Sequence, residues 1–247
     1  MIRIKKNKKP PQVLVINELT WTTELLNQIS IYGSYKNLPD AIKEIIATRY
    51  KHNDIKNSLI PKLDTKCAFC ESMPNESGYI EVEHYLPKSI YHNVTYSWEN
   101  LLPSCKRCNL KKLALDTGKY PIVKPDSEDP EDYFSYNSIK IIAKKDCKDK
   151  IKAKRTINKL ELNQHRLIKP RSELLVNLVD YENELEKTII EFKKAINANK
   201  KNRIKSNIME SIDKIDDLQK NDVKFSGFCK HYILNSKVIN EARNTIA

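Results

Sequence analysis

Four cysteines in two Cys-x-x-Cys pairs enclose the residues of this chain that could carry out chemistry. Cys67 and Cys70 form the first pair, and Cys105 and Cys108 form the second. Two thiolates three residues apart lie on one side of a tight turn, and two such pairs supply four ligands for one ion. A tetrahedral set of thiolates selects zinc and leaves no open coordination position. The sequence therefore predicts a structural zinc, with the catalytic groups elsewhere; the alternative is two unrelated pairs.

The residues between and beside the two pairs offer a carboxylate, an imidazole and an amide. Glu83 and His84 are adjacent, and Asn109 directly follows the last cysteine. Carboxylate and amide oxygens suit hard divalent cations, and a histidine of ordinary pKa accepts a proton at cellular pH. This combination is typical of a metal-dependent hydrolytic site. The alternative is that Glu83 and His84 end a surface strand in a zinc module without catalytic activity.

The order of these motifs resembles an HNH endonuclease of the ββα-metal (His-Me finger) class whose core is held by a four-cysteine zinc. The resemblance covers residues 67–112, through the segments Cys67-Ala68-Phe69-Cys70, Val82-Glu83-His84-Tyr85-Leu86-Pro87-Lys88, Trp98-Glu99-Asn100-Leu101 and Cys105-Lys106-Arg107-Cys108-Asn109-Leu110-Lys111-Lys112. It implies an enzyme that hydrolyses phosphodiester bonds of nucleic acid, with His84 as the general base. It further implies that Glu83 and Asn109 bind the catalytic metal. Asn100 would hold the intervening loop by side-chain hydrogen bonds, and a plain turn residue is the alternative.

Two positions depart from the commoner pattern of this class. Glu83 stands where aspartate is more frequent, and Asn109 stands where histidine is more frequent. Both still offer oxygen ligands, which favour Mg²⁺ or Mn²⁺ over zinc or nickel at the catalytic metal. Basic residues near these motifs are candidate contacts to nucleic-acid phosphates, namely Lys88, Lys106, Arg107, Lys111 and Lys112. The alternative for them is a solvated cationic surface.

Three segments resemble more narrowly the HNH effectors of Septu and related retron-associated anti-phage systems. They are the opening residues 1–11, the block 84–88 and residues 156–171. This resemblance implies a partner ATPase of the PtuA type that licenses cleavage; the sequence itself contains no G-x-x-x-x-G-K-[ST] nucleotide-binding motif. Two alternatives stay open. One is a stand-alone HNH restriction or nicking endonuclease, and the other is a non-catalytic zinc-stapled adaptor that binds nucleic acid or protein.

The charge of the chain agrees with a nucleic-acid partner, and we expect DNA rather than RNA. The net charge is +12, and residues 144–171 carry eleven lysines and arginines against three acidic residues, whereas residues 126–132 form an acidic island. Segregated charge of this kind favours a binding face for a polyanion, and a solvated helix is the alternative. Neither a signal peptide nor a membrane-spanning apolar run is evident, so we expect a cytoplasmic protein without a membrane partner.

The elements that must position these residues are mostly helical, because glycine is scarce and apolar residues recur at helical spacing. The sequence predicts a helix-rich α+β protein with a small zinc-stapled ββα-metal core. Four parts are expected: an N-terminal helical extension over residues 1–60, the HNH core over 61–118, an acidic and proline-containing linker over 119–147, and a basic C-terminal helical domain over 148–247.

Local patterns predict individual elements within these parts. Helices are expected over residues 22–30 and from Pro39, a strand over 79–85, and a metal-bearing helix from residue 104 or 105 to about 115. An apolar stripe over residues 174–196 predicts a long helix that packs on a second helix over 204–218, or in the groove of a partner protein. A closing helix is expected over residues 225–246.

Overall fold

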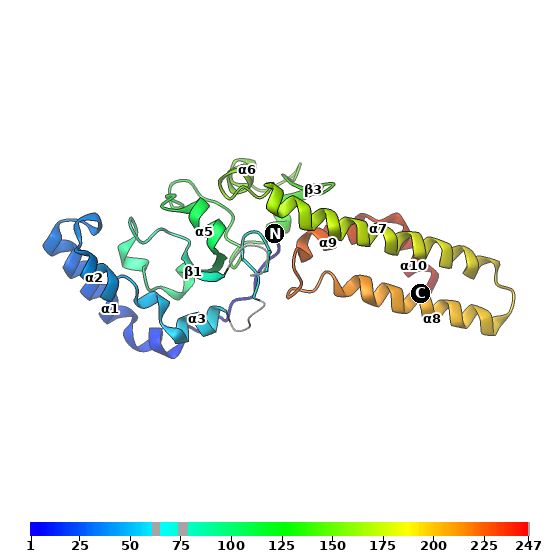
Figure 1. Cartoon of the computed structure of the whole chain (residues 1–247), viewed down its shortest axis with the longest axis horizontal. Helices are drawn as coiled ribbons and strands as arrows, with labels where there is room; N and C mark the ends of the chain where they lie inside the picture. Colours follow the sequence, from blue (N-terminus) through cyan, green and yellow to red (C-terminus); the bar gives the residue numbers. More distant parts are fainter. Residues whose placement is uncertain (61–64, 74–78, 247) are drawn as a thin grey trace.

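A helical extension, a central region with two small sheets and a long helical hairpin follow one another along the longest axis of the molecule (Figure 1). This computed structural model describes residues 1–60, 65–73 and 79–246. The described residues form a helix-rich α+β protein with two antiparallel two-stranded sheets, which confirms the predicted fold class. The predicted domain boundary at residue 61 lies outside the described residues.

The N-terminal extension contains helices α1 (Gln12–Tyr32), α2 (Asp40–Ile45) and α3 (Asn53–Leu59), with short 3-10 helices η1 (Tyr35–Asn37) and η2 (Arg49–Lys51). Helix α1 is much longer than the predicted segment 22–30, because it begins directly after Pro11 and ends only at Gly33, which has a φ of 76°. Buried residues of this extension, including Leu14, Leu25 and Ile55, form one cluster with the loop and the strand that follow His84. The loop and the strand contribute Tyr96, Trp98 and Leu101 to this cluster.

The central region carries the expected ββα arrangement. Strand β1 (Ile80–His84) pairs antiparallel with β2 (Leu101–Cys105), with His84 opposite Leu101, and helix α5 (Lys106–Lys112) follows directly. The 3-10 helices η3 (His92–Val94) and η4 (Trp98–Asn100) lie in the connection between the strands. The helix begins where predicted but ends earlier, because Leu113 adopts a φ of 46°, a region that side-chain-bearing residues rarely occupy.

Residues 119–147, expected as a linker, contain a second hairpin that sequence patterns did not indicate. It consists of η5 (Pro130–Asp132) and the antiparallel strands β3 (Phe134–Asn137) and β4 (Lys140–Ala143). Asn163 fixes β4 to the segment after helix α6 (Lys150–Lys159). The side-chain oxygen of Asn163 accepts from the backbone N–H of Ile141 at 2.9 Å, and its amide nitrogen donates to the Ile141 carbonyl at 2.8 Å. Tertiary hydrogen bonds therefore stabilise this hairpin.

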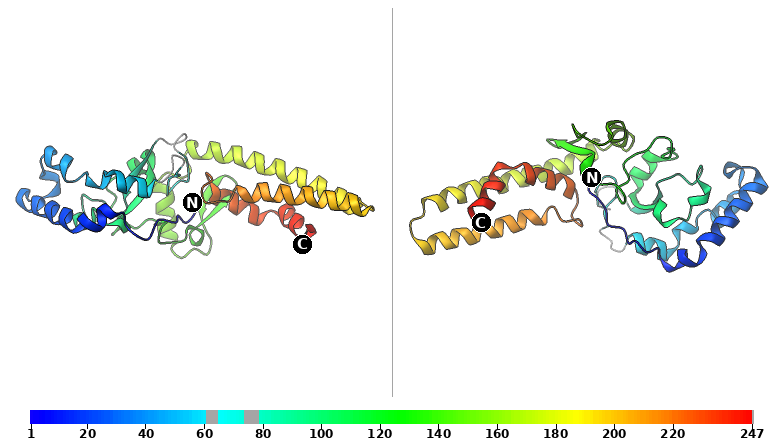
Figure 2. Two further views of the ribbon diagram at one scale, coloured as in Figure 1. Left: turned by 90° about the horizontal axis from the view of Figure 1, so that it is seen from below. Right: turned by 180° about the vertical axis from the view of Figure 1, so that it is seen from behind.

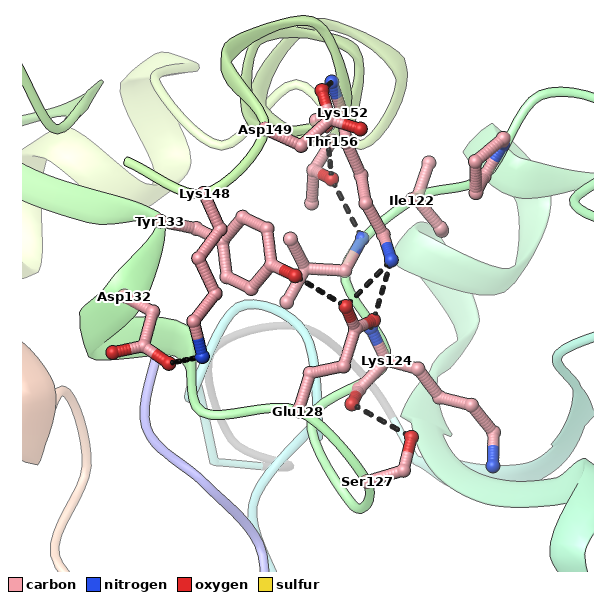
Figure 3. Close-up of polar contacts among 12 residues, drawn as sticks. Ile122, Lys124, Ser127, Glu128, Asp132, Tyr133, Lys148, Asp149, Lys152 and Thr156 are labelled. Atoms are coloured by element: carbon pink, nitrogen blue, oxygen red, sulfur yellow. Dashed lines mark hydrogen bonds and ion pairs between the residues drawn. The ribbon is translucent and has the colours of Figure 1, made fainter. Parts of the chain in front are cut away.

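The acidic island is paired with the basic segment in the folded chain (Figure 3). Glu128 accepts hydrogen bonds from Lys152 at 2.6 and 2.7 Å and from the Tyr133 hydroxyl at 2.5 Å. Asp132 forms an ion pair with Lys148 at 2.5 Å. Lys148 and Lys152 are thus neutralised by the acidic island, whereas a polyanion-binding face on the remaining basic residues of 144–171 stays a prediction.

The C-terminal part is built on a helical hairpin of α7 (His165–Lys194) and α8 (Ala198–Asp217) (Figure 2). The apolar stripe of α7 packs on α8 as predicted, and the buried residues include Leu178, Leu185 and Ile189 of α7 and Ile204, Ile208, Ile212 and Ile215 of α8. The expected closing helix is two helices, α9 (Ser226–Asn235) and α10 (Lys237–Ile246). The break occurs at Ser236, whose hydroxyl accepts a hydrogen bond from the N–H of Ile239 at 3.0 Å and so caps α10.

Across the described part of the chain, no helix combines the length and the apolar character needed to cross a membrane.

Candidate active site

The four cysteines converge into one buried cluster. Their sulfur atoms all lie within 4.8 Å of one another, and the Sγ atoms of Cys70 and Cys105 are 3.8 Å apart. Four thiolates at a zinc–sulfur distance of about 2.3 Å in a tetrahedron are separated by about 3.8 Å. The donor set and its spacing therefore fit a structural zinc. The N–H of Ala68 donates to the Pro103 carbonyl at 2.9 Å, which ties the first cysteine pair to β2.

Polar groups from outside the two pairs surround this cluster. The guanidinium of Arg166, in the first turn of α7, lies 3.9 Å from Cys108 Sγ, and the Ser72 hydroxyl lies 2.9 Å from Cys70 Sγ. Four thiolates around one divalent zinc leave a net negative charge, which a nearby guanidinium offsets. Arg166 thereby connects the C-terminal hairpin to the candidate zinc centre, a role that no local sequence pattern indicated.

His84 ends strand β1 with a buried and fixed imidazole. Its Nε2 lies 2.8 Å from the Thr95 carbonyl oxygen; because a carbonyl only accepts, Nε2 carries the proton and Nδ1 is left as the basic nitrogen. Burial lowers the pKa of His84 to about 3, an effect that the nearby Lys88 and Lys112 reinforce against the opposing Thr95 hydrogen bond. The imidazole is therefore neutral at cellular pH, but it is a weaker base than the histidine of ordinary pKa that the sequence predicted.

Tyr50 of η2 packs directly on this imidazole. The two rings meet edge to face with centroids 4.4 Å apart, and the Lys88 ammonium lies 4.5 Å from the centre of the Tyr50 ring. Lys88 also donates to the Ala47 carbonyl at 3.1 Å, and burial lowers its pKa to about 8. Sequence reasoning missed Tyr50, because its helical spacing with preceding isoleucines indicated only core packing.

Asn100 makes the loop contacts that the resemblance implied. Its side-chain oxygen accepts from the N–H of Leu86 at 2.7 Å, and its amide nitrogen donates to the carbonyls of Leu86 at 3.0 Å and Val94 at 3.1 Å. The side chain is buried, and its backbone carbonyl accepts from the N–H of Tyr85. Both ends of the loop after His84 are thus held by one residue, next to the Thr95 carbonyl that orients the imidazole.

Glu83 forms a buried ion pair that sequence reasoning did not foresee. The ammonium of Lys112 lies 2.8 Å from Glu83 Oε1 and donates to the His84 carbonyl at 2.7 Å, and its side chain is fully buried. Burial raises the pKa of Glu83, while the ion pair with Lys112 opposes this effect. Lys112 was expected to contact nucleic acid at the surface; its burial corrects that expectation.

Asn109, the middle residue of α5, contacts strand β1, which carries Glu81 and Glu83. Its amide nitrogen donates to Glu81 Oε2 at 2.8 Å, which leaves its side-chain oxygen available as a ligand. A cavity of about 220 Å³ is lined by Glu83, His84, Lys88 and Asn109 together. The oxygens of Glu83 and Asn109 are the donors that Mg²⁺ or Mn²⁺ prefers, so the site fits the expected catalytic ion.

The other candidate phosphate contacts lie on the exposed side of α5. Lys106 and Arg107 are exposed in its first turn, whereas Lys111 forms an ion pair with Glu161 at 2.7 Å. Helix α5 therefore presents near its N-terminus two cations that form no ion pair with the described residues, and the expectation that they bind phosphate stays a prediction.

Replacing Lys112 with methionine is expected to destabilise the fold by about 3–5 kcal/mol, because Glu83 would remain buried without a partner. Replacing the neighbouring Lys111 is the matched control; its ion pair is half exposed, and such pairs contribute about 0.2–1 kcal/mol. Urea unfolding of the two variants checks this difference. Equal losses for the two lysines would show that the Glu83 ion pair does not support the fold.

Replacing Tyr50 with alanine is expected to slow the phosphodiester cleavage that the sequence motifs predict, by up to about 10²-fold, because the imidazole loses the ring that holds it in place. Replacing it with phenylalanine retains the edge-to-face contact and should leave the rate near that of the wild type. Single-turnover cleavage rates, corrected for the folded fraction, measure both effects. A phenylalanine variant as slow as the alanine variant would assign the effect to the hydroxyl instead.

Comparison with known proteins places these residues in a described family. Residues 67–114 match the family of HNH endonucleases. Septu protein PtuB from Bacillus thuringiensis is 38% identical to this chain over 157 residues, which cover 63% of this chain and 58% of the relative. Septu protein PtuB from Bacillus mycoides (strain KBAB4) is 38% identical over 73 residues, which cover 24% of this chain and 25% of the relative. The chain thus spans less than two thirds of the length of these relatives.

Proposed function

Because this chain carries an HNH endonuclease domain and is homologous to Septu protein PtuB, we propose that it is a metal-dependent endonuclease that hydrolyses phosphodiester bonds of nucleic acid. It acts as the nuclease effector of an anti-phage defence system and is gated by a partner ATPase of the PtuA type. The observation that carries the proposal is that His84, Glu83 and Asn109 line one cavity. The basic nitrogen of His84 there is Nδ1, because Nε2 donates to the Thr95 carbonyl.

His84 is the general base of the proposed reaction. The hydrogen bond from Nε2 to the Thr95 carbonyl and the ring of Tyr50 fix the imidazole, so that Nδ1 can accept a proton from the attacking water. General-base catalysis of this kind typically contributes about 10²–10⁴ in rate. Asn100 supports the same geometry indirectly, since it holds the loop that carries Thr95.

Glu83 and Asn109 are the proposed protein ligands of the catalytic ion. Bound Mg²⁺ or Mn²⁺ would neutralise charge on the phosphoryl oxygens and stabilise the leaving oxygen. Two protein ligands suffice for such an ion, because it retains several waters. The contact of Lys112 with Glu83 Oε1 orients the carboxylate and balances its charge. The hydrogen bond from Asn109 to Glu81 engages the amide nitrogen of Asn109, so the amide oxygen is the atom that would bind the ion.

A partner ATPase accounts for the control that such an enzyme requires. An unregulated nuclease would damage the DNA of its own cell, and the sequence contains no nucleotide-binding motif of the P-loop type. The homology to Septu protein PtuB supports a partner from the same kind of system. We therefore propose that cleavage in the presence of Mg²⁺ or Mn²⁺ depends on a second chain that binds ATP.

The decisive experiment compares cleavage of plasmid DNA and of total RNA by the purified chain, with and without an ATPase of the PtuA type. Cleavage that requires both His84 and the ATPase would support the proposal. Cleavage that requires His84 alone would indicate a stand-alone restriction or nicking enzyme. Nucleic-acid binding that survives the loss of His84, with no cleavage under any condition, would favour the adaptor.

A further inference from the structure

The cavity around His84 adjoins a second cavity along strand β1. The second cavity has a volume of about 370 Å³, and the two share three lining residues, Tyr50, Val82 and Asn109. The first cavity extends from these residues towards Glu83 and His84, and the second extends in the opposite direction along the strand, towards Ile80. Together they form a groove whose floor is β1.

Two different parts of the chain form the walls of this groove. One wall is α5, through Asn109, and the other is the segment η2–α3, which contributes Tyr50, Lys51 and Lys56. Helix α3 and the 3-10 helix η2 lie outside residues 67–114, which match the HNH family. The N-terminal extension therefore completes a groove that the HNH domain alone would leave open.

The wall from η2–α3 carries cations without a counter-charge. Lys51 and Lys56 are both exposed, and within the described residues neither takes part in an ion pair. The Lys51 ammonium lies 5.8 Å from the centre of the Tyr50 ring. The carboxylate of Glu81 lines the same cavity and accepts a hydrogen bond from the neutral amide of Asn109, but it forms no ion pair with either lysine in the described part of the chain. These two lysines differ in this respect from Lys148 and Lys152, whose charges the acidic island offsets.

We propose that Lys51 and Lys56 bind phosphate groups of a nucleic-acid strand that lies in the groove along β1, beside the phosphodiester bond in the His84 cavity. Ammonium groups on flexible stems serve as point charges for phosphates, and the groove leads from them directly to the candidate general base. The inference rests on the proposed function and deepens it, because it assigns a substrate-binding role to residues outside the HNH domain.

Binding, measured apart from cleavage, tests this inference. Full-length protein with His84→Ala and full-length protein with His84→Ala, Lys51→Gln and Lys56→Gln are titrated, without divalent metal, into a fluorescently labelled DNA oligonucleotide and an RNA of the same sequence. Fluorescence anisotropy gives the affinity at several salt concentrations between about 50 and 200 mM. The matched control carries Lys187→Gln and Lys200→Gln instead, since both lysines are exposed on the distant α7–α8 hairpin.

The loss of both groove lysines is expected to weaken binding roughly tenfold or more at the lowest salt. The slope of log affinity against log salt should fall by about 2, because each phosphate contact contributes about 1. The control variant should keep both the affinity and the slope. Weakening on DNA, on RNA or on both supports the inference and identifies the strand that the groove accepts.

Two outcomes would overturn the inference, and they separate it from the proposed function. If the groove variant binds with unchanged affinity and slope while the wild-type chain cleaves in a His84-dependent manner, the endonuclease stands and the strand takes another path. If the chain binds no nucleic acid at any salt concentration and cleaves none, the inference and the proposed function both fail. Circular dichroism and thermal unfolding of each variant confirm that differences in binding do not arise from loss of fold.

Discussion

Replacing His84 with alanine is expected to lower the cleavage rate by about 10²–10⁴-fold, the usual contribution of a general base. The expectation follows from the geometry of the imidazole, which donates through Nε2 to the Thr95 carbonyl and so leaves Nδ1 as the proton acceptor. No other histidine lines this cavity in the described part of the chain. Cleavage of labelled nucleic acid under single-turnover conditions measures the effect.

The controls for His84 separate loss of the base from loss of structure. Alanine leaves the buried Thr95 carbonyl without a donor, which costs about 1–3 kcal/mol, so zinc content and the unfolding transition are measured alongside activity. His84→Gln keeps a side-chain N–H but has no basic nitrogen, and it should be as inactive as alanine. His165→Ala, at an exposed position at the start of α7, should retain full activity. An active and folded His84→Ala protein would remove this residue from the mechanism.

Replacing Cys105 with serine is expected to release zinc and to lower the free energy of unfolding by about 4 kcal/mol or more, the range in which loss of a metal site falls. Structural zinc stabilises a fold directly, because the unfolded chain does not hold the preformed site. Cys105 also caps α5, since its sulfur accepts from the N–H of Cys108 at 3.4 Å. Serine is a good helix cap, so this substitution removes the metal ligand and retains the cap.

The matched control for Cys105 is Cys147→Ser, because Cys147 is a half-buried free thiol outside the cluster. Zinc content by elemental mass spectrometry should be close to one ion per chain in the wild type and in the control, and well below one in Cys105→Ser. Urea unfolding should show the same order. If Cys105→Ser unfolds at the same urea concentration as the control, the four cysteines are not a structural metal site.

Local motifs were sufficient to predict the centre of this protein. The two cysteine pairs, the strand that ends at His84 and the helix after Cys105 are encoded by short segments of fixed spacing, and the structure has each of them. The hydrogen bonds of Asn100 likewise span only the loop beside it. In these cases the residues that determine the conformation are close together in the sequence.

Features that depend on distant segments escaped prediction. Tyr50 reaches the imidazole from η2, and Arg166 reaches the cysteine cluster from α7. The break at Ser236 and the β3–β4 hairpin also depend on side chains from elsewhere, namely Glu182 and Asn163. The burial of Lys112 was within reach, because it lies four residues after Cys108 and hence on the same face of α5.

The contact of Tyr50 with His84 means that the segment that matches the HNH family and the segment that surrounds the imidazole have different boundaries. A recombination event that moved only residues 67–114 into another protein would transfer the four cysteines and the imidazole. It would leave behind the aromatic ring that packs on that imidazole and the lysines of the adjoining wall. Such a transplanted module would inherit the four cysteines and an imidazole without the ring that packs on it here.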